Sequence, residues 1–235
     1  GRDGLGDLVR YSGASGNVIV DLGTDNQTIA VTTASDGFGG QDTLIRIENV
    51  RSGSGDDQLS GDVNNNVLIG GGGADSLVGR GGNDALLISD AGFTLVDGGS
   101  GQDTLSLREG FTLDLGSVVG TISSIEAISL NTSSSATLTA TLADVVNLSG
   151  EINTAVDSAA ASQIPGTPIS ATDSILVSGN AADTVNLNTG GASGGWVDTA
   201  QSVTIGADSY NVYNYVDGAS ILATVAVDAD VNTVT

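Results

Sequence analysis

The chain has 235 residues, a formal net charge of −22 and only six basic side chains, so its surface should repel nucleic acid and anionic membranes and attract cations. It contains no Cys and no His, which argues against a disulfide-stapled domain, excludes imidazole catalysis and disfavours zinc, copper and iron–sulfur sites. No apolar run approaches the ~20 residues of a membrane span, so we expect no membrane insertion of this segment.

The first fifty residues are predicted to form short strands between turns. Residues 18–22 (VIVDL) and 28–31 (TIAV) are β-rich runs bounded by Gly, Asp or Asn. Residues 42–50 (DTLIRIENV) alternate apolar and polar side chains, which predicts one half-buried strand. We interpret residues 1–50 as extra coils, with looser loops, of the repeat region that follows.

Residues 52–87 repeat with a period of nine: SGSGDDQLS, GDVNNNVLI, GGGGADSLV and GRGGNDALL. Small or polar residues, most of them glycine, fill most of the first four columns. The sixth column holds Asp57, Asn66, Asp75 and Asp84. The eighth column holds Leu59, Leu68, Leu77 and Leu86. The pattern recurs in degraded form at residues 37–44 (GFGGQDTL) and nearly intact at 98–105 (GGSGQDTL).

Each nine-residue unit should form a tight turn followed by a short strand. The first six positions are too rich in glycine for a helix or a strand and suit a turn with positive φ and exposed carbonyls. The last three positions form a strand with one apolar side chain pointing inward. Two units complete one turn of a flattened parallel coil, so that residues 18 apart stack ~4.8 Å from each other.

This stacking places carboxylates of successive coils side by side, Asp57 with Asp75 and Asn66 with Asp84. Two carboxylates at ~5 Å repel each other by roughly 3 kcal/mol at an effective dielectric of 20. A thin ladder of leucines should not overcome several such pairs, so we expect the metal-free coil to stay open. A hard divalent cation between adjacent loops would turn the repulsion into binding, and calcium accepts six to eight carboxylate and carbonyl oxygens.

The register Gly-Gly-x-Gly-x-Asp-x-Leu-x closely resembles the calcium-binding nonapeptide of repeats-in-toxin (RTX) proteins. The resemblance implies that each ion is bound by the Asp column and loop carbonyls of two stacked repeats: Asp57 with Asp75, Asn66 with Asp84, and Asp84 with Asp103. The last pair is 19 residues apart, so one extra residue must be absorbed between them. Asn66 removes a charge and should weaken its site.

The resemblance implies that some residues bind calcium directly and that others form the turns whose carbonyls bind it. Together these residues are Ser52, Ser54, Asp57, Asn66, Gly70, Gly71, Gly72, Gly73, Asp75, Gly79, Gly81, Gly82, Asp84, Gly99, Gly101 and Asp103. The phrase DTL…IENV at residues 42–50 also commonly precedes nonapeptides in RTX proteins. It makes Asp42 a further candidate ligand, although Asp42 lies 15 residues before Asp57 and is out of register.

After residue 87 the register fails for about one coil turn and resumes at residue 98. Residues 105–148 alternate in places as strands do, and residues 142–148 could form one or two helical turns, because their apolar spacing has mixed periods. Residues 150–172 are small and polar and contain both prolines, which indicates a linker or a long surface loop.

From residue 173 the β pattern returns as short strands with turn residues at close intervals, as in a small antiparallel meander or sandwich. Four of the eight aromatic residues lie here: Trp196, Tyr210, Tyr213 and Tyr215. They would form either a ligand-binding patch or the core of a small β domain, and we favour the core.

The phrases SILVSGNAADTVNL, GGWVDT and SYNVYNYVDGASILATVAVD resemble the C-terminal region of very large bacterial RTX adhesins exported by type I secretion. In that family this region caps the roll and contains an uncleaved export signal. Residues 221–235 are compatible with such a signal. We therefore predict a mainly β chain in three parts. A right-handed parallel β-roll spans residues 1–108, most regular at 52–87 and 98–106. Roll-capping strands and a linker span residues 109–172, and residues 173–235 form a small β-rich capping domain with the export signal.

The predicted function is that of a non-catalytic, monomeric calcium-binding module of a secreted or cell-surface bacterial adhesin. It would contact the type I secretion machinery during export and the upstream adhesin domains afterwards. One alternative is the calcium-binding tail of a type I-secreted protease or lipase. Another is a β surface that binds glycans or ice, for which Thr-x-Thr should recur in register on successive coils.

Overall fold

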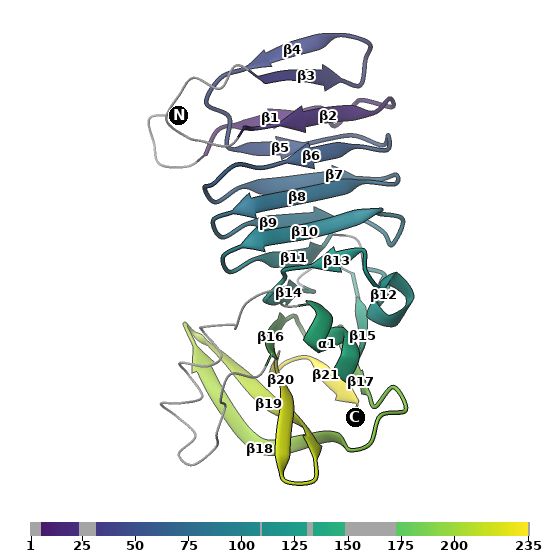
Figure 1. Cartoon of the computed structure of the whole chain (residues 1–235), viewed down its shortest axis with the longest axis vertical. Helices are drawn as coiled ribbons and strands as arrows, with labels where there is room; N and C mark the ends of the chain where they lie inside the picture. The colour runs from purple at the N-terminus through teal and green to yellow at the C-terminus, as the bar shows by residue number, and fades with distance from the viewer. Residues whose placement is uncertain (1–5, 24–31, 109, 131–133, 149–172, 235) are drawn as a thin grey trace. The chain divides into compact units, whose positions relative to one another are not determined.

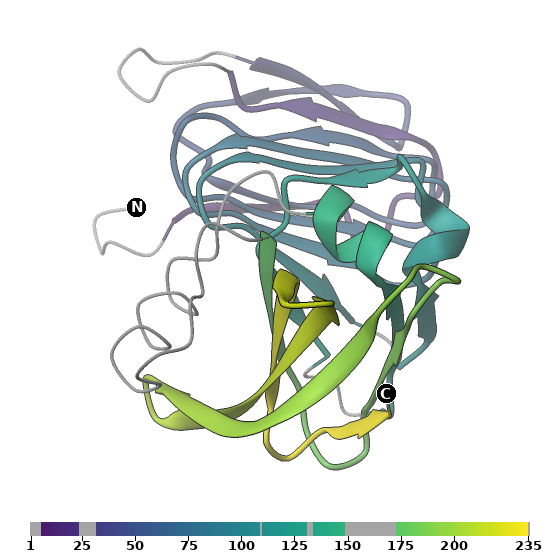
Figure 2. The ribbon, with the colours of Figure 1, turned by 60° about the horizontal axis from the view of Figure 1, so that its bottom comes forward.

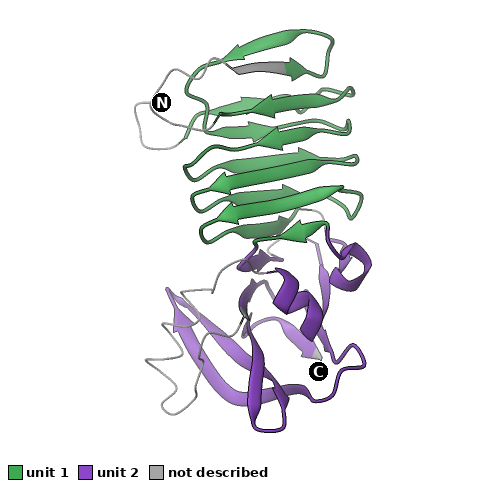
Figure 3. Ribbon diagram, in the orientation of Figure 1, with its two compact units in different colours: residues 1–108, 121–124 green, residues 109–120, 125–235 purple. Residues whose placement is uncertain are grey.

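The computed structural model describes residues 6–23, 32–108, 110–130, 134–148 and 173–234. It divides into two compact units, residues 1–108 with 121–124 and residues 109–120 with 125–235 (Figure 3). Among the described residues no helix is long and apolar enough to cross a membrane.

The first unit is a coil of short strands stacked in two parallel sheets (Figure 1). One sheet contains, in spatial order, β1 (Leu8–Arg10), β5 (Asn49–Arg51), β7 (Val67–Gly71), β9 (Ala85–Ile88) and β11 (Thr104–Leu107). The other contains β13 (Ile122–Ser123), β10 (Leu95–Ser100), β8 (Ser76–Gly81), β6 (Gln58–Ser60) and β2 (Val18–Asp21). The chain passes from one sheet to the other at every turn, which confirms the predicted mainly β fold with a parallel β-roll.

The strand register follows the sequence period. Val67 pairs with Ala85 and Gln58 with Ser76, each 18 residues apart. Ser76 pairs with Leu95 and Ala85 with Thr104, each 19 apart. The register first shortens by one residue between Ile69 and Gly71, because Ile69 pairs with Leu87 but Gly71 with Ile88. The segment from Ile88 to Leu95 is then two residues longer than the segment from Gly71 to Ser76, which leaves one extra residue.

The inward side chains form an apolar ladder on each of the two sheets, and the two ladders face each other. Leu59, Leu77 and Val96 are in register on one sheet and Val50, Leu68 and Leu86 on the other, and each is at most 1% exposed. In β7, β8 and β9, these buried residues alternate with half-buried ones that face outward. Each ladder therefore forms because the eighth column of every unit points the same way.

The N-terminal part departs from the predicted coils. β1 and β2 extend the two sheets by one coil, in parallel with β5 and β6. However, β3 (Thr32–Asp36) and β4 (Gln41–Leu44) add to β2 as an antiparallel hairpin. The prediction of one strand over residues 42–50 is wrong, because the chain leaves β4 at Leu44, passes through Arg46 with φ 56° and enters β5 only at Asn49. The run at residues 28–31 lies outside the described residues.

The second unit also contains two sheets (Figure 2). In one, β14 (Ala127–Ser129), β16 (Asp173–Ser178) and β20 (Ser220–Asp228) are parallel, and β19 (Asp208–Asp217) and β18 (Gly195–Ile205) follow in antiparallel order. In the other, β12 (Thr112–Asp114), β15 (Thr137–Thr141), β17 (Thr184–Asn188) and β21 (Asn232–Val234) are all parallel. The expected antiparallel meander is thus limited to β18–β20.

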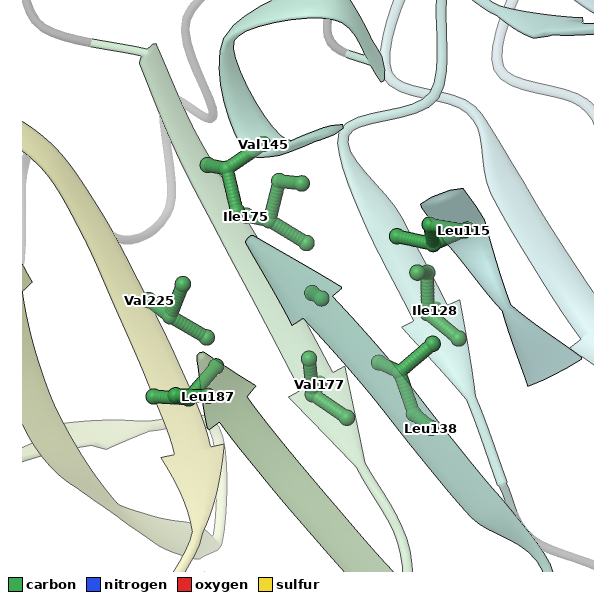
Figure 4. A pocket seen from close by; sticks show the side chains of 9 residues that line it. Leu115, Ile128, Leu138, Val145, Ile175, Val177, Leu187 and Val225 are labelled. Carbon is green, nitrogen blue, oxygen red and sulfur yellow. The ribbon is translucent and has the colours of Figure 1, made fainter. Parts of the chain in front are cut away.

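Strands from both sides of residues 149–172 pair within these sheets, so the expected division between residues 109–172 and 173–235 falls inside this unit. The physical reason is a shared core: Ile128 and Leu138 pack with Val177 and Leu187 around a void of about 10 Å³, too small for a ligand (Figure 4). The segment whose periodicity was mixed forms helix α1 (Leu142–Leu148), and Val145 of α1 closes the core beside the short 3₁₀ helix η1 (Leu115–Val118).

Candidate metal centre

The turns that join the two sheets of the roll lie along its two edges (Figure 1). The turns of the first edge lie within residues 52–57 and 70–75, and those of the second edge within residues 61–66, 79–84 and 98–103, where β7, β8 and β10 extend into the first residues of three of these segments. Each turn ends with a residue of the sixth column, which therefore repeats once per coil along an edge.

Side chains of this column form a hydrogen-bonded ladder. On the second edge, the backbone N–H of Asn66 donates to Oδ1 of Asp84 (2.7 Å), and that of Asp84 donates to Oδ1 of Asp103 (2.7 Å). On the first edge, the N–H of Asp57 donates to Oδ1 of Asp75 (3.0 Å). Asp57 in turn accepts from the N–H of Val18 (2.7 Å). The structure thus brings together the three pairs of residues that the sequence places on successive coils.

The second oxygen of these carboxylates points into the turn. Among the described side chains, Oδ2 of Asp57 and Oδ2 of Asp84 are buried without a hydrogen-bond partner. A buried, unpaired carboxylate oxygen is costly unless a cation or donor meets it. A Cβ on Gly70 would collide with Oδ2 of Asp75, and one on Gly79 with Oδ2 of Asp84, so glycine at these two positions leaves room for that oxygen.

Backbone carbonyls supply the remaining oxygens of the site. Within the described ranges no three carboxylates gather closely enough to hold an ion by themselves, so a hard cation would have to draw on carbonyls as well. The stacked turns bring such carbonyls close, because a Cβ on Gly101 would collide with the carbonyl of Gly82. Five turn glycines share a positive φ between 93° and 135°: Gly71, Gly73, Gly82, Gly99 and Gly101. This all-oxygen set suits calcium.

The other predicted residues have varied roles. Ser52 is buried, and its hydroxyl donates to the carbonyls of Ile69 (3.0 Å) and Gly70. Ser54 donates to the carbonyl of Ala14 (3.5 Å). A Cβ on Gly81 would come within 3.3 Å of the Ser100 hydroxyl, whereas nothing lies within 4 Å of one on Gly72.

Asp42 lies on β4, outside the stacked turns, and accepts a hydrogen bond from the hydroxyl of Tyr11 (3.0 Å). The structure therefore does not bring Asp42 together with the sixth-column residues.

Sequence reasoning missed a second ladder, in the fifth column. Oδ1 of Asn65 accepts from the N–H of Asn83 (2.8 Å), and Oδ1 of Asn83 accepts from the N–H of Gln102 (3.1 Å). Asp56 accepts in the same way from the N–H of Ala74 (2.9 Å). These bonds run opposite to those of the sixth column, so each turn is tied to the next in both directions. The signal in the sequence is Asp or Asn directly before the sixth column in three of the four consecutive repeats.

Burial in the turns makes ionisation of the sixth column unfavourable. It raises the pKa of Asp75 from 3.8 to about 6, against the lowering effect of the hydrogen bond from Asp57. It raises the pKa of Asp84 from 3.8 to about 7, with a further contribution from the charge of Asp103. Burial also raises the pKa of Asp57. The metal-free turns therefore favour protons, or another cation, on these carboxylates.

We expect the metal-free roll to become more stable on acidification. Because Asp75 and Asp84 have pKa values of about 6 and about 7 when folded and 3.8 ordinarily, the folded state binds more protons between these values. Their stabilisation is complete below about pH 4 and is lost as the pH rises through about 6 to 7. In calcium-free buffer, the β signal of the chain in far-UV circular dichroism should therefore be larger at pH 5 than at pH 8.

The matched control for the pH experiment is the double variant Asp75→Asn, Asp84→Asn, which keeps an Oδ1 acceptor but cannot ionise. Its β signal in calcium-free buffer should vary much less between the two pH values. An equal or larger β signal for the unmodified chain at pH 8 would contradict the prediction.

The four aromatic residues after residue 173 are buried, which confirms their interpretation as core. Trp196 is 8% exposed and Tyr215 is fully buried, and their rings meet edge to face with centroids 5.4 Å apart. The indole N–H of Trp196 donates to the carbonyl of Asn188, and the Tyr215 hydroxyl donates to that of Ser193, each at 3.0 Å. Tyr210 and Tyr213 are 5% and 7% exposed. These rings are engaged in packing rather than presented to a ligand.

The fold and the oxygen-lined turns define a calcium-binding parallel β-roll. The family model of the RTX calcium-binding nonapeptide repeat, in four copies, matches residues 51–86. No curated protein matches the chain significantly. The match at residues 51–86 indicates a calcium-binding module of the secreted type, with calcium as the cofactor of this roll.

Proposed function

We propose that calcium binding winds this roll, so that the module is open where calcium is scarce and folds where it is abundant. The observation that supports the switch is the pair of buried Oδ2 atoms, on Asp57 and Asp84, that have no hydrogen-bond partner. Without a cation, each costs desolvation energy that the thin apolar ladder has to offset. At the ~10⁻⁴–10⁻³ M dissociation constants typical of extracellular calcium modules, ions would fill the turns outside a cell but not in the cytosol.

We further propose that the module belongs to a bacterial adhesin exported by type I secretion to the cell surface, with an export signal in residues 221–235. The support is the resemblance of the C-terminal phrases to that class. Most of this segment lies in β20, which pairs with both β16 and β19 and whose Ala223, Val225 and Val227 are buried. The secretion machinery would therefore have to bind it before the second unit folds.

The tail of a secreted protease or lipase is the competing assignment, because such enzymes have similar rolls. The two differ in what precedes the roll. A zinc-ligand His motif or a Gly-x-Ser-x-Gly upstream would favour the enzyme, and long tandem repeats would favour the adhesin.

The structure offers a limited match to an ice-binding face. Thr112, Thr137 and Thr184 lie in register on the parallel strands β12, β15 and β17. Two positions further along, however, Thr139 is flanked by Asp114 and Asn186. Thr-x-Thr thus occurs on one strand rather than on successive strands, and we do not favour ice as the ligand.

A calcium titration of the full chain by far-UV circular dichroism tests the folding switch. From chelator to millimolar calcium we expect a cooperative gain of β signal. The variant Asp75→Ala should need at least tenfold more calcium, because it removes a carboxylate and the acceptor for the N–H of Asp57. Asp208→Ala, which removes an exposed carboxylate of the second unit, should leave the midpoint unchanged. Full β signal in chelator, unaffected by calcium, would overturn the switch.

A further inference from the structure

Arg80 occupies the second column of its repeat, where Gly53, Gly71 and Gly99 stand in other repeats. Its φ is 78°, and the residues of the same repeat column, Gly71 and Gly99, have φ 94° and 98°. An L side chain in this region is strained, and such strain persists where the surrounding contacts compensate for it. The contacts of Arg80 should therefore explain why it replaces glycine.

The Arg80 guanidinium gathers four oxygen atoms. Its Nη1 donates to Oδ1 of Asp21 (2.6 Å) and to the carbonyls of Gly23 (2.6 Å) and Gly61 (2.8 Å), and its Nη2 donates to Oδ2 of Asp21 (2.8 Å). A carboxylate and two backbone carbonyls are the same kind of oxygen ligands that calcium takes. Bidentate geometry with further hydrogen bonds also distinguishes this contact from an ordinary surface ion pair.

These contacts connect three neighbouring strands of one sheet. Arg80 lies on β8, Gly61 directly follows β6, and Asp21 ends β2, in the spatial order β8, β6, β2. Asp21 and Arg80 are 59 residues apart in sequence. One side chain therefore fastens three successive coils on the same side of the roll.

The turn at residues 61–66, which Arg80 contacts, does not present the unpaired oxygen found elsewhere. Asn66 replaces the aspartate; its Oδ1 accepts from the N–H of Asp62 (2.7 Å), and its Nδ2 donates to the carbonyl of Glu48 (2.8 Å). A Cβ on Gly61 would collide with Oδ1 of Asn66, so Gly61 lies against the Asn66 amide while its carbonyl accepts from Arg80. The Asn66 amide and the Arg80 guanidinium thus supply the hydrogen bonds of this turn.

We propose that Arg80 is a built-in cation of the turn at residues 61–66: it takes the place of calcium there and holds these coils together in the metal-free chain. The inference rests on the calcium-driven winding proposed above. It identifies a calcium-independent point from which the roll can wind, while the carboxylates of Asp57, Asp75 and Asp84 still require the metal.

The test compares the full chain with Arg80→Gly, Asn66→Asp and the double variant. Glycine is the residue of this column in other repeats and accepts the positive φ, so Arg80→Gly removes the side chain without adding strain. Calcium stoichiometry is counted by isothermal titration calorimetry, and β signal in chelator is followed by circular dichroism. Arg80→Gly should lose β signal in chelator and raise the calcium midpoint several-fold.

The ion count separates a built-in cation from a merely structural arginine. Asn66→Asp alone should bind as many ions as the unmodified chain, because Arg80 already neutralises the turn. The double variant should bind one more. An extra ion in Asn66→Asp alone, or none in the double variant, would overturn the proposal.

A second variant keeps the test decisive if Arg80→Gly fails to wind at any calcium concentration. Asp21→Asn leaves the turns and their backbone untouched and should shift the calcium midpoint in the same direction by a smaller factor; an unchanged midpoint would overturn the proposal. The titration of the unmodified chain tests the calcium switch separately. The calcium switch and the role of Arg80 can therefore be rejected independently of each other.

Discussion

Replacing Gly71 by alanine is expected to unwind the roll even in saturating calcium. Gly71 has φ 94°, and a Cβ there would collide with the carbonyl oxygen of Gly53 in the neighbouring turn. The variant therefore combines left-handed strain with a clash against backbone that cannot rotate away. We expect the free energy of unfolding to fall by about 3 kcal/mol or more, measured by urea denaturation at millimolar calcium.

The adjacent glycine provides the matched control. A Cβ on Gly72 would meet no atom within 4 Å, so Gly72→Ala should change stability by no more than about 0.5 kcal/mol. The calcium concentration at the midpoint of folding should also rise more in Gly71→Ala than in Gly72→Ala, because the clash displaces a turn of the first edge. Equal behaviour of the two variants would show that the turns do not stack as closely as the structure indicates.

Truncation of the apolar ladder is the second large effect we expect. Leu77 is fully buried between the sheets, in register with Leu59 and Val96 on the strands either side. Leu77→Ala should lower the free energy of unfolding of the calcium-loaded chain by about 2–5 kcal/mol, because it leaves a cavity in the core between the two sheets. Urea denaturation monitored by circular dichroism measures the difference.

Val78 is the control for this truncation, because it follows Leu77 in β8 and faces outward. Val78→Ala should cost at most about 1 kcal/mol, the span of strand propensities. If both variants lost the same stability, the alternation of inward and outward side chains in this strand would be wrong.

Much of the roll could be predicted from the amino-acid sequence alone, because the pattern that specifies it is local and repeated. A turn of small residues, an aspartate and an inward leucine recur every nine residues, so any pairing that buries the leucines also stacks the aspartates at a spacing of 18. Prediction failed where that repetition stops. The break at Arg46 and the hairpin of β3 and β4 have no counterpart in the repeat, and alternation alone could not reveal that residues 42–50 divide into two strands.

The period, the buried leucines, the two edges of stacked aspartates and the preference for a cation with oxygen ligands can thus be derived from the amino-acid sequence. Which oxygen atoms stay unpaired depends on the fold, since Oδ1 and Oδ2 of Asp84 differ only through the position of the neighbouring turn. The tertiary structure also decided that Arg80 meets Asp21, and that β15 pairs with β17. These contacts join segments tens of residues apart, and their geometry depends on how the coils pack rather than on any pattern within one repeat.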